Sequence, residues 1–189
     1  MIKKIAVFVG SLRKESFNRK TAIALTKLAP VSLAPEIIEI GHLPLYNQDY
    51  DDEHNPPEAW TEFRKRVKPF DGFLFVTPEY NRSVPAVLKN ALDVGSRPYG
   101  QSVWGGGKPG AVISVSPGVI GGFGANHHLR QSLVFLDVHP MQQPEAYIGD
   151  AAKLFDRDGN VTNETTLKFL QDFMAAFADW VLKISKEEA

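Results

Sequence analysis

The apolar run Ile5-Ala6-Val7-Phe8-Val9 leads directly into the polar segment Gly10-Ser11-Leu12-Arg13-Lys14-Glu15-Ser16-Phe17-Asn18. The run is too short for the core of a helix and is rich in residues that favour β-structure, so it predicts a buried parallel strand. A helical pattern begins near Phe17, because Ala22, Leu25 and Ala29 recur at spacings of three and four residues. The start of the chain therefore predicts a strand, a tight polar turn and a helix.

The turn between this strand and this helix has the composition of an anion site. Unpaired N–H groups of a first helical turn converge on one spot, and the helix dipole favours negative charge there. Ser11, Ser16 and Asn18 add neutral donors, and Arg13 offers a planar fork that suits phosphate oxygens. The alternative is an ordinary strand-to-helix turn in which Ser16 only caps the helix. The turn by itself leaves both interpretations open.

The composition is that of a globular chain without a strong charge field. With 189 residues the chain is most simply one domain spanning 1–189, and an apolar fraction of 43% can build a sizeable core. A formal net charge of −1 would recruit neither nucleic acid nor anionic lipid. Because the chain has no cysteine, disulfides, thiolate metal sites and thiol nucleophiles are excluded. No run reaches the length of a signal peptide core or a membrane span, so we expect a cytoplasmic protein.

Strand and helix patterns alternate along the rest of the chain. Further short apolar runs predict strands at 36–40, 73–76, 111–115 and within 139–148. Apolar periodicity predicts helices over 57–68, from Ser83 onward, around 129–136 and over 167–184. This alternation is typical of a parallel sheet with helices on both faces.

For a chain of this size we expect the flavodoxin-like α/β fold, a three-layer sandwich around a five-stranded parallel sheet of order 2-1-3-4-5. The alternative, a six-stranded dinucleotide-binding fold, lacks its fingerprint G-x-G-x-x-G after the first strand. The Walker signature is also missing, which disfavours nucleoside-triphosphate hydrolysis. Asp156-Arg157-Asp158-Gly159-Asn160 lacks the remainder of a calcium loop and predicts a plain turn.

Three polar loops follow the first, third and fourth predicted strands, at 10–18, 77–83 and 116–122. These strands are neighbours in the expected order, and ligands of such sheets bind at the carboxyl ends of the strands. The second loop offers the backbone amides of Glu79, Tyr80 and Asn81, and the third offers glycines that would let a flat ring approach the backbone. A phosphate at one loop and a planar heterocycle at the other two match the shape of flavin mononucleotide (FMN).

Two motifs stand out in these loops: Gly10-Ser11-Leu12-Arg13-Lys14 with Ser16 and Asn18, and Thr77-Pro78-Glu79-Tyr80-Asn81 with Ser83-Val84-Pro85. Together they resemble the NAD(P)H-dependent FMN reductases, and within them the chromate and quinone reductase branch. The run Gly118-Val119-Ile120-Gly121-Gly122 fits that branch too. The resemblance implies bound FMN, NADPH or NADH as co-substrate, and reduction of quinones or of other oxidants such as chromate, free flavin or azo compounds. It also implies a homodimer or homotetramer with the flavin near a subunit interface.

The same resemblance implies a set of cofactor-binding residues. Those expected to hold the phosphate and ribityl chain are Ser11, Arg13, Ser16, Phe17 and Asn18. Those expected to lie against the isoalloxazine ring are Pro78, Glu79, Tyr80, Asn81, Ser116 and Gly118. One departure concerns the subunit contact: where similar proteins carry an Arg and a Tyr that pair with a Glu across subunits, this chain has Gly124 and His127, with the Glu retained as Glu145.

Hydride transfer from a nicotinamide to a flavin needs no protein nucleophile, so we predict no catalytic residue and no metal. Arg82 and Arg97 are candidates for contacting the nicotinamide nucleotide, against the plainer interpretation of solvated surface arginines. The alternative function is a non-enzymatic electron carrier of the flavodoxin type. The near-zero net charge and the long loops at 41–57 and 95–109 favour the enzyme.

Overall fold

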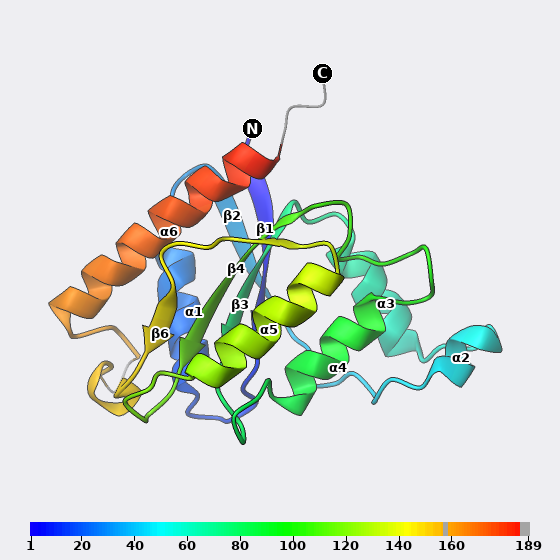
Figure 1. Ribbon diagram of the computed structural model, residues 1–189, viewed down its shortest axis with the longest axis horizontal. Coiled ribbons are helices and arrows are strands. Elements are labelled where there is room, and N and C mark those ends of the chain that lie inside the picture. The colour runs from blue at the N-terminus through cyan, green and yellow to red at the C-terminus, as the bar shows by residue number, and fades with distance from the viewer. Residues whose placement is uncertain (157–158, 186–189) are drawn as a thin grey trace.

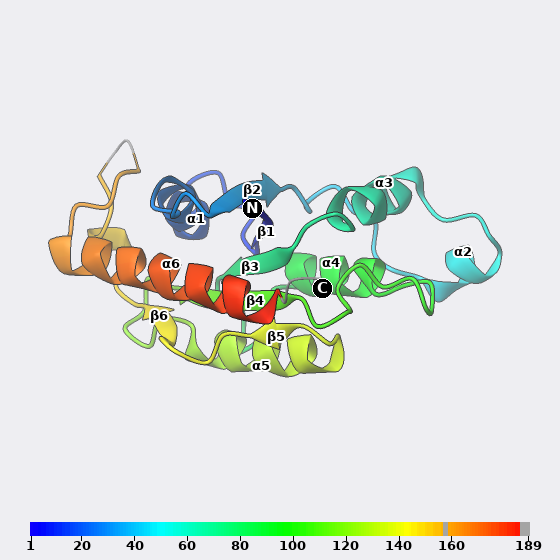
Figure 2. The same ribbon diagram turned by 90° about the horizontal axis from the view of Figure 1, so that it is seen from above.

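The computed structural model describes residues 1–156 and 159–185 and has three layers, with a central sheet between two layers of helices (Figures 1 and 2). The strands are β1 (Lys3–Val9), β2 (Leu33–Ile38), β3 (Gly72–Thr77), β4 (Pro109–Val115), β5 (His139–Pro140) and β6 (Ala146–Ile148). All pair in parallel in the order β2-β1-β3-β4-β5, with β6 also on β4. The predicted flavodoxin-like order is confirmed.

The helices are α1 (Phe17–Lys27), α2 (Gln48–Asp52), α3 (Glu58–Val67), α4 (Ala86–Gly95), α5 (Phe123–Phe135) and α6 (Glu164–Ile184), with a short 3₁₀ turn at Ala151–Lys153. Side chains of β1 alternate between two cores: Ile5 and Val7 pack with α1 and α6, whereas Ala6 and Phe8 pack with α3, α4 and α5. Figure 2 shows these helices on opposite sides of the sheet. Within the described residues, none of these helices has the length and apolarity that a membrane crossing requires.

The fifth position of the sheet differs from the single strand expected within 139–148. It is divided into β5, which pairs with Pro109–Gly110, and β6, which pairs with Ile113–Val115. The Met141 N–H donates to the Gly110 carbonyl at 2.8 Å, after which the chain leaves β4 and pairs with it again from Ala146; Pro144, between the two, has no N–H to donate. Of the predicted turn at 156–160, residues 157–158 lie outside the described residues; Phe155 and Val161 form an antiparallel bridge.

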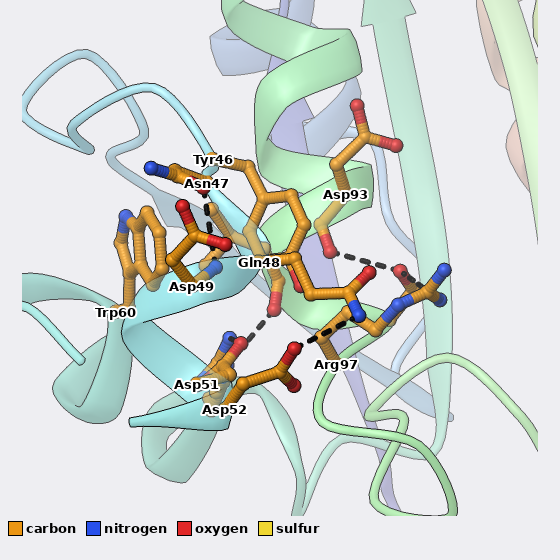
Figure 3. Close-up of polar contacts among 12 residues, drawn as sticks. Tyr46, Asn47, Gln48, Asp49, Asp51, Asp52, Trp60, Asp93 and Arg97 are labelled. Carbon is orange, nitrogen blue, oxygen red and sulfur yellow. Dashed lines mark hydrogen bonds and ion pairs between the residues drawn. The ribbon is translucent and has the colours of Figure 1, made fainter. Parts of the chain in front are cut away.

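The long connection at 41–57 contains α2, which the sequence did not predict, and is fixed to α3 and α4 (Figure 3). The Trp60 indole donates to the Pro44 carbonyl at 3.0 Å, and its ring lies 5.1 Å from the Tyr46 ring. Asn90 on α4 donates to the same carbonyl at 3.0 Å and accepts from the Tyr46 N–H at 2.8 Å. This connection is thus an ordered part of the α3–α4 face.

A buried ion pair adds to this attachment. The Arg64 guanidinium binds both carboxylate oxygens of Asp51 at 2.7 Å, and the two side chains are 13% and 5% exposed. The remaining Nε of Arg64 donates to the Val94 carbonyl at 2.8 Å. A bidentate pair with this extra bond satisfies both charges, which is the condition for burying them without a large penalty.

Candidate functional site

The loops that follow β1, β3 and β4 meet around one cavity of about 210 Å³ at the carboxyl edge of the sheet. Its lining comprises Ser11, Arg13, Phe17, Asn18, Pro78, Glu79, Tyr80, Val115, Ser116 and Pro117. Eight of the eleven predicted cofactor residues are therefore brought together, and Ser16, Asn81 and Gly118 lie outside this lining. Val115 and Pro117 were not predicted, and only their position at the end of a strand could have indicated them.

Gly10 explains how the first two loops come so close. A Cβ atom on Gly10 would lie 2.9 Å from Cγ of Pro85 and 3.0 Å from Cδ of Pro78. Such distances are shorter than a carbon–carbon contact allows, so any side chain at Gly10 would separate the two loops. The Gly10 N–H also donates to the Val76 carbonyl at 2.9 Å, which extends the β1–β3 pairing into the site.

The first loop presents the N-terminus of α1 to the cavity. Ser16 caps this helix: its Oγ accepts from the Arg19 N–H at 3.1 Å, and the side chain is buried. The N–H groups of Phe17 and Asn18 precede the first possible intrahelical acceptor and point out of the helix end. The exposed Arg13 forms no ion pair with any residue in the described ranges. This end of the cavity is therefore suited to an anion.

Asn18 carries an orphan acceptor. The residue is 4% exposed and its Nδ2 donates to the Val115 carbonyl at 3.2 Å, whereas its Oδ1 has no hydrogen-bond donor among residues 1–156 and 159–185. A buried acceptor without a donor costs about 1–3 kcal/mol. Because Asn18 lines the cavity, a ligand hydroxyl there would remove this cost.

The second loop folds back on itself in a tight turn. The N–H groups of Tyr80 and Ser83 donate to each other's carbonyls at 3.1 and 3.0 Å, with Asn81 and Arg82 at φ of 51° and 66°. Two consecutive left-handed residues are the signature of a type I′ turn and are uncommon outside glycine. The Tyr80 amide is therefore used within the turn and is not available to a ligand, contrary to our expectation. The amides of Glu79, Asn81 and Arg82 donate to no acceptor in the part of the chain that the structure describes.

One further expectation about this region is wrong. Helix α4 begins at Ala86 with Pro85 as its cap, and Ser83 instead hydrogen-bonds through Oγ to Nδ1 of His128 at 3.1 Å. In the loop after β4, Gly121 and Gly122 lie in close packing contacts, whereas a Cβ on Gly118 would meet only the Ser116 Oγ at 3.6 Å among the described residues. A Cβ on Gly121 would lie 2.7 Å from the Tyr147 carbonyl carbon, and one on Gly122 would lie 3.0 Å from Cβ of Ser114.

The other members of the third loop are held by backbone contacts. The Ser116 N–H donates to the Ile148 carbonyl at 2.9 Å, and its Oγ accepts from the Gly118 N–H at 3.2 Å. Ser116 therefore lines the cavity with a hydroxyl that accepts from Gly118, and Gly118 itself is exposed.

His127, which stands where similar proteins carry a tyrosine, contacts residues of its own chain. His127 Nε2 lies 2.9 Å from the Tyr147 hydroxyl, and the Phe123 ring lies 4.3 Å from the imidazole. Burial, reinforced by the neighbouring Glu145 carboxylate, raises the pKa of Tyr147 to about 12. The phenol therefore stays protonated near neutral pH.

Comparison with known proteins agrees with this geometry. Residues 3–153 match the family model described as NADPH-dependent FMN reductase. The chain belongs to this family. It is 65% identical over 180 residues to a quinone reductase of Pseudomonas putida, covering 95% of each chain. It is 52% identical over 181 residues to a 2-hydroxy-1,4-benzoquinone reductase of a Burkholderia species, covering 96% of this chain and 97% of that protein.

Among solved structures, the chain resembles FerB, a flavoenzyme NAD(P)H:(acceptor) oxidoreductase from Paracoccus denitrificans, with a TM-score of 0.89 and 46% identity. The match covers 97% of this chain and 99% of that one. The cavity has features that the family's cofactor requires: an open helix N-terminus beside Arg13, the orphan Oδ1 of Asn18, and a lining residue, Glu79, in a turn with unpaired amides. The residues present therefore fit FMN.

Proposed function

We propose that this chain is an FMN-dependent oxidoreductase that passes reducing equivalents from NAD(P)H to quinones. The observation that carries the proposal is the single cavity in which the loops after β1, β3 and β4 meet. The N-terminus of α1 lies at this cavity, and the second loop, whose turn carries unpaired amides, lines it through Pro78, Glu79 and Tyr80. The matched relatives span nearly the whole chain and are named reductases, which supports the enzyme over an electron carrier.

In this proposal the phosphate of FMN lies at the N-terminus of α1, with the N–H groups of Phe17 and Asn18 and the Arg13 guanidinium as donors. Ser11 lines the same end of the cavity, and Ser16 acts indirectly by capping the helix. The Oδ1 of Asn18 accepts from a ribityl hydroxyl. Among the described residues that line the cavity, this Oδ1 is the one buried side-chain oxygen without a hydrogen-bond donor, and the assignment provides that donor.

The ring of the cofactor is proposed to lie against the second loop. Pro78 and Tyr80 supply apolar surface, and the amides of Glu79, Asn81 and Arg82 supply donors for the polar edge of the ring. When bound, FMN would supply the two-electron chemistry that links the nicotinamide to the acceptor, so that NAD(P)H, a proton and a quinone yield NAD(P)⁺ and a hydroquinone. The protein's contribution is to stack, orient and exclude water.

Of the two arginine candidates for the nicotinamide nucleotide, we favour Arg82. Its side chain is 75% exposed and it adjoins Glu79 and Tyr80 at the cavity. The Arg97 guanidinium is engaged elsewhere: it lies 4.0 Å from the centre of the Tyr99 ring and donates to the Tyr99 hydroxyl at 3.0 Å. Arg97 also follows the C-terminal end of α4, whereas the cavity lies near the N-terminal end of that helix.

Chromate, free flavin and azo compounds are further acceptors that we propose to test beside quinones. We propose a homodimer or homotetramer located in the cytoplasm, with the large exposed apolar side chains Phe123, Val134 and Phe135 of α5 available for a subunit contact. Similar proteins have a tyrosine in place of His127. Because His127 here bonds to Tyr147 of the same chain, a subunit contact at this position would differ from theirs.

The experiment is anaerobic mixing of the purified protein with NADPH and, separately, with NADH, followed by addition of a panel of quinones. We expect a yellow protein whose flavin absorbance bleaches within seconds and returns when a quinone is added. Flavin that stays oxidised for minutes with both nucleotides would refute the enzyme, and a protein that takes up no FMN would refute the cofactor. Sedimentation of the same sample gives the assembly state.

A further inference from the structure

Helix α5 begins without a cap of its own. Its N-cap residue is Gly122, which has no side chain, and no acidic residue lies in its first turn. Ala125 is the third residue of the helix, so its N–H group has no intrahelical carbonyl to bind. The missing acceptor comes from a distant segment: Oε2 of Glu79 accepts from the Ala125 N–H at 3.0 Å, across 46 residues of sequence.

Glu79 belongs to the turn that lines the proposed flavin cavity. Its side chain is only 12% exposed, and its second oxygen lies 3.3 Å from the Arg82 guanidinium. The turn is joined to α5 at a second point by the bond of 3.1 Å between Ser83 Oγ and His128 Nδ1. The 79–83 segment is therefore attached to one face of α5 at both of its ends.

Gly124 makes this attachment possible. A Cβ atom at Gly124 would lie 2.9 Å from Oε2 of Glu79 and 2.9 Å from the Arg82 carbonyl oxygen. The backbone of Gly124 is helical, where alanine is the better residue by propensity, so nothing but this approach favours glycine there. The close contact involves a backbone oxygen as well as the carboxylate, so a side chain at Gly124 would move the turn itself.

We propose that Glu79 is a positioning residue: its carboxylate caps α5 and thereby holds the 79–82 amides in place for the flavin ring, with Gly124 providing the room. The inference rests on the proposed function for the identity of the ring. The Glu79 carboxylate accepts from the Ala125 N–H through one oxygen and faces the Arg82 guanidinium with the other, so both oxygens serve to hold the turn against α5. Its negative charge beside the cavity also favours oxidised over reduced, electron-richer flavin.

The variants are Glu79→Gln, Glu79→Ala and Gly124→Ala, with Glu62→Gln and Gly105→Ala as controls. Glu62 is exposed on α3, and a Cβ on Gly105 would meet only the Leu136 oxygen at 4.0 Å among the described residues. We expect Glu79→Ala to weaken FMN binding about tenfold or more, as for loss of a hydrogen bond to a charged group. Gly124→Ala should also weaken FMN binding. In the double variant Glu79→Ala/Gly124→Ala, the loss of binding free energy should be smaller than the sum of the two single losses, because both substitutions act on one contact. The controls should bind as the wild type does.

Two readouts separate positioning from a general loss of structure. Glu79→Gln keeps an acceptor oxygen but loses the charge, so we expect FMN affinity within about threefold of wild type. Its reduction potential should rise by up to about 30 mV, which corresponds to a tenfold change in the relative affinity for reduced and oxidised flavin. In the apoprotein, hydrogen exchange at the Ala125 amide should accelerate in Glu79→Ala and stay slow in Glu62→Gln.

Wild-type FMN affinity together with unchanged Ala125 exchange in Glu79→Ala would overturn the inference, as would an unchanged potential in Glu79→Gln. If Glu79→Ala fails to fold, two other measurements test the inference: the reduction potential of Glu79→Gln and the FMN affinity of Gly124→Ala. Wild-type values for both would overturn it. A wild-type protein that binds no FMN would refute the proposed function, whereas the exchange measurement on apoprotein tests the attachment of Glu79 to α5 without any flavin.

Discussion

Asn18→Leu is the substitution that most directly tests the cavity, because the structure predicts different effects on folding and on binding. In the apoprotein the wild-type amide has one bond, from Nδ2 to the Val115 carbonyl at 3.2 Å, and one buried oxygen without a donor among the described residues. Leucine has nearly the same shape. It leaves the Val115 carbonyl unpaired, at a cost of about 1–3 kcal/mol, but removes an orphan oxygen of similar cost. The free energy of unfolding of the apoprotein should therefore change by less than about 1 kcal/mol.

Binding of FMN should respond much more strongly to this substitution. If a ribityl hydroxyl donates to Oδ1 in the wild type, binding relieves the orphan oxygen, and Asn18→Leu forfeits about 1–3 kcal/mol. At 1.4 kcal/mol per tenfold, the dissociation constant of FMN should rise between about fivefold and about 150-fold. Quenching of FMN fluorescence on titration with apoprotein measures this constant, and urea unfolding of the apoprotein measures stability.

Asn90→Leu is the matched control. Asn90 is also buried, but its amide bonds to the Leu43 and Pro44 carbonyls and to the Tyr46 N–H, and it lies outside the cavity lining. We expect it to lose about 2–4 kcal/mol of stability, from three bonds at about 1 kcal/mol each, with FMN affinity within threefold of wild type. The reasoning would be refuted by an Asn18→Leu protein that binds FMN within twofold of wild type, or by one that loses stability as Asn90→Leu does.

Three further outcomes are expected. Arg13→Ala should weaken FMN by about 1.5–3 kcal/mol, and the difference from wild type should shrink as salt is added; an unchanged affinity in a fluorescence titration would remove Arg13 from the phosphate site. Asp51→Asn should cost about 3–5 kcal/mol of unfolding free energy in urea, because it leaves the Arg64 charge buried and unpaired; a loss below 1 kcal/mol would contradict the buried pair. The raised pKa of Tyr147 means that the folded protein holds the phenolic proton more tightly than the unfolded chain, so the free energy of unfolding should fall as pH rises from about 10 to about 12. Tyr147→Phe should flatten that decline. Unfolding curves with the same pH dependence in both proteins would count against the raised pKa.

Much of the architecture could be predicted because it depends on local patterns. The runs Ile5–Val9 and Phe73–Val76 are apolar at every position, as strands covered on both faces must be, and the helix after Ser16 shows both its cap and its period. The fifth strand was predicted only as a region, because its two short halves are recognisable only by their pairing with β4. Helix α2 was missed because five residues show no period, and its place comes from Trp60, Asn90 and Arg64 on other helices.

The candidate site divides in the same way. The residues that line it could be named from the loops after three strands, since parallel strands bring those loops to one edge. Their individual tasks could not, because each depends on the partner that the folded chain brings to it. The Tyr80 N–H donates to the Ser83 carbonyl, the Ser116 hydroxyl accepts from the Gly118 N–H, and the Glu79 carboxylate accepts from the Ala125 N–H, 46 residues away.

The sequence alone indicated a parallel sheet with helices on both faces and the three polar loops that follow its strands, because apolar runs and helical periods are local patterns. Only the tertiary structure decided which polar groups remain open to a ligand. A donor or acceptor is available only if no neighbour in the folded chain has satisfied it. Some of those neighbours are distant in sequence: Glu79 and Ala125 are 46 residues apart, and Asn18 and Val115 are 97 residues apart. The orphan Oδ1 of Asn18 and the capped α5 beside Glu79 are both consequences of that three-dimensional pairing.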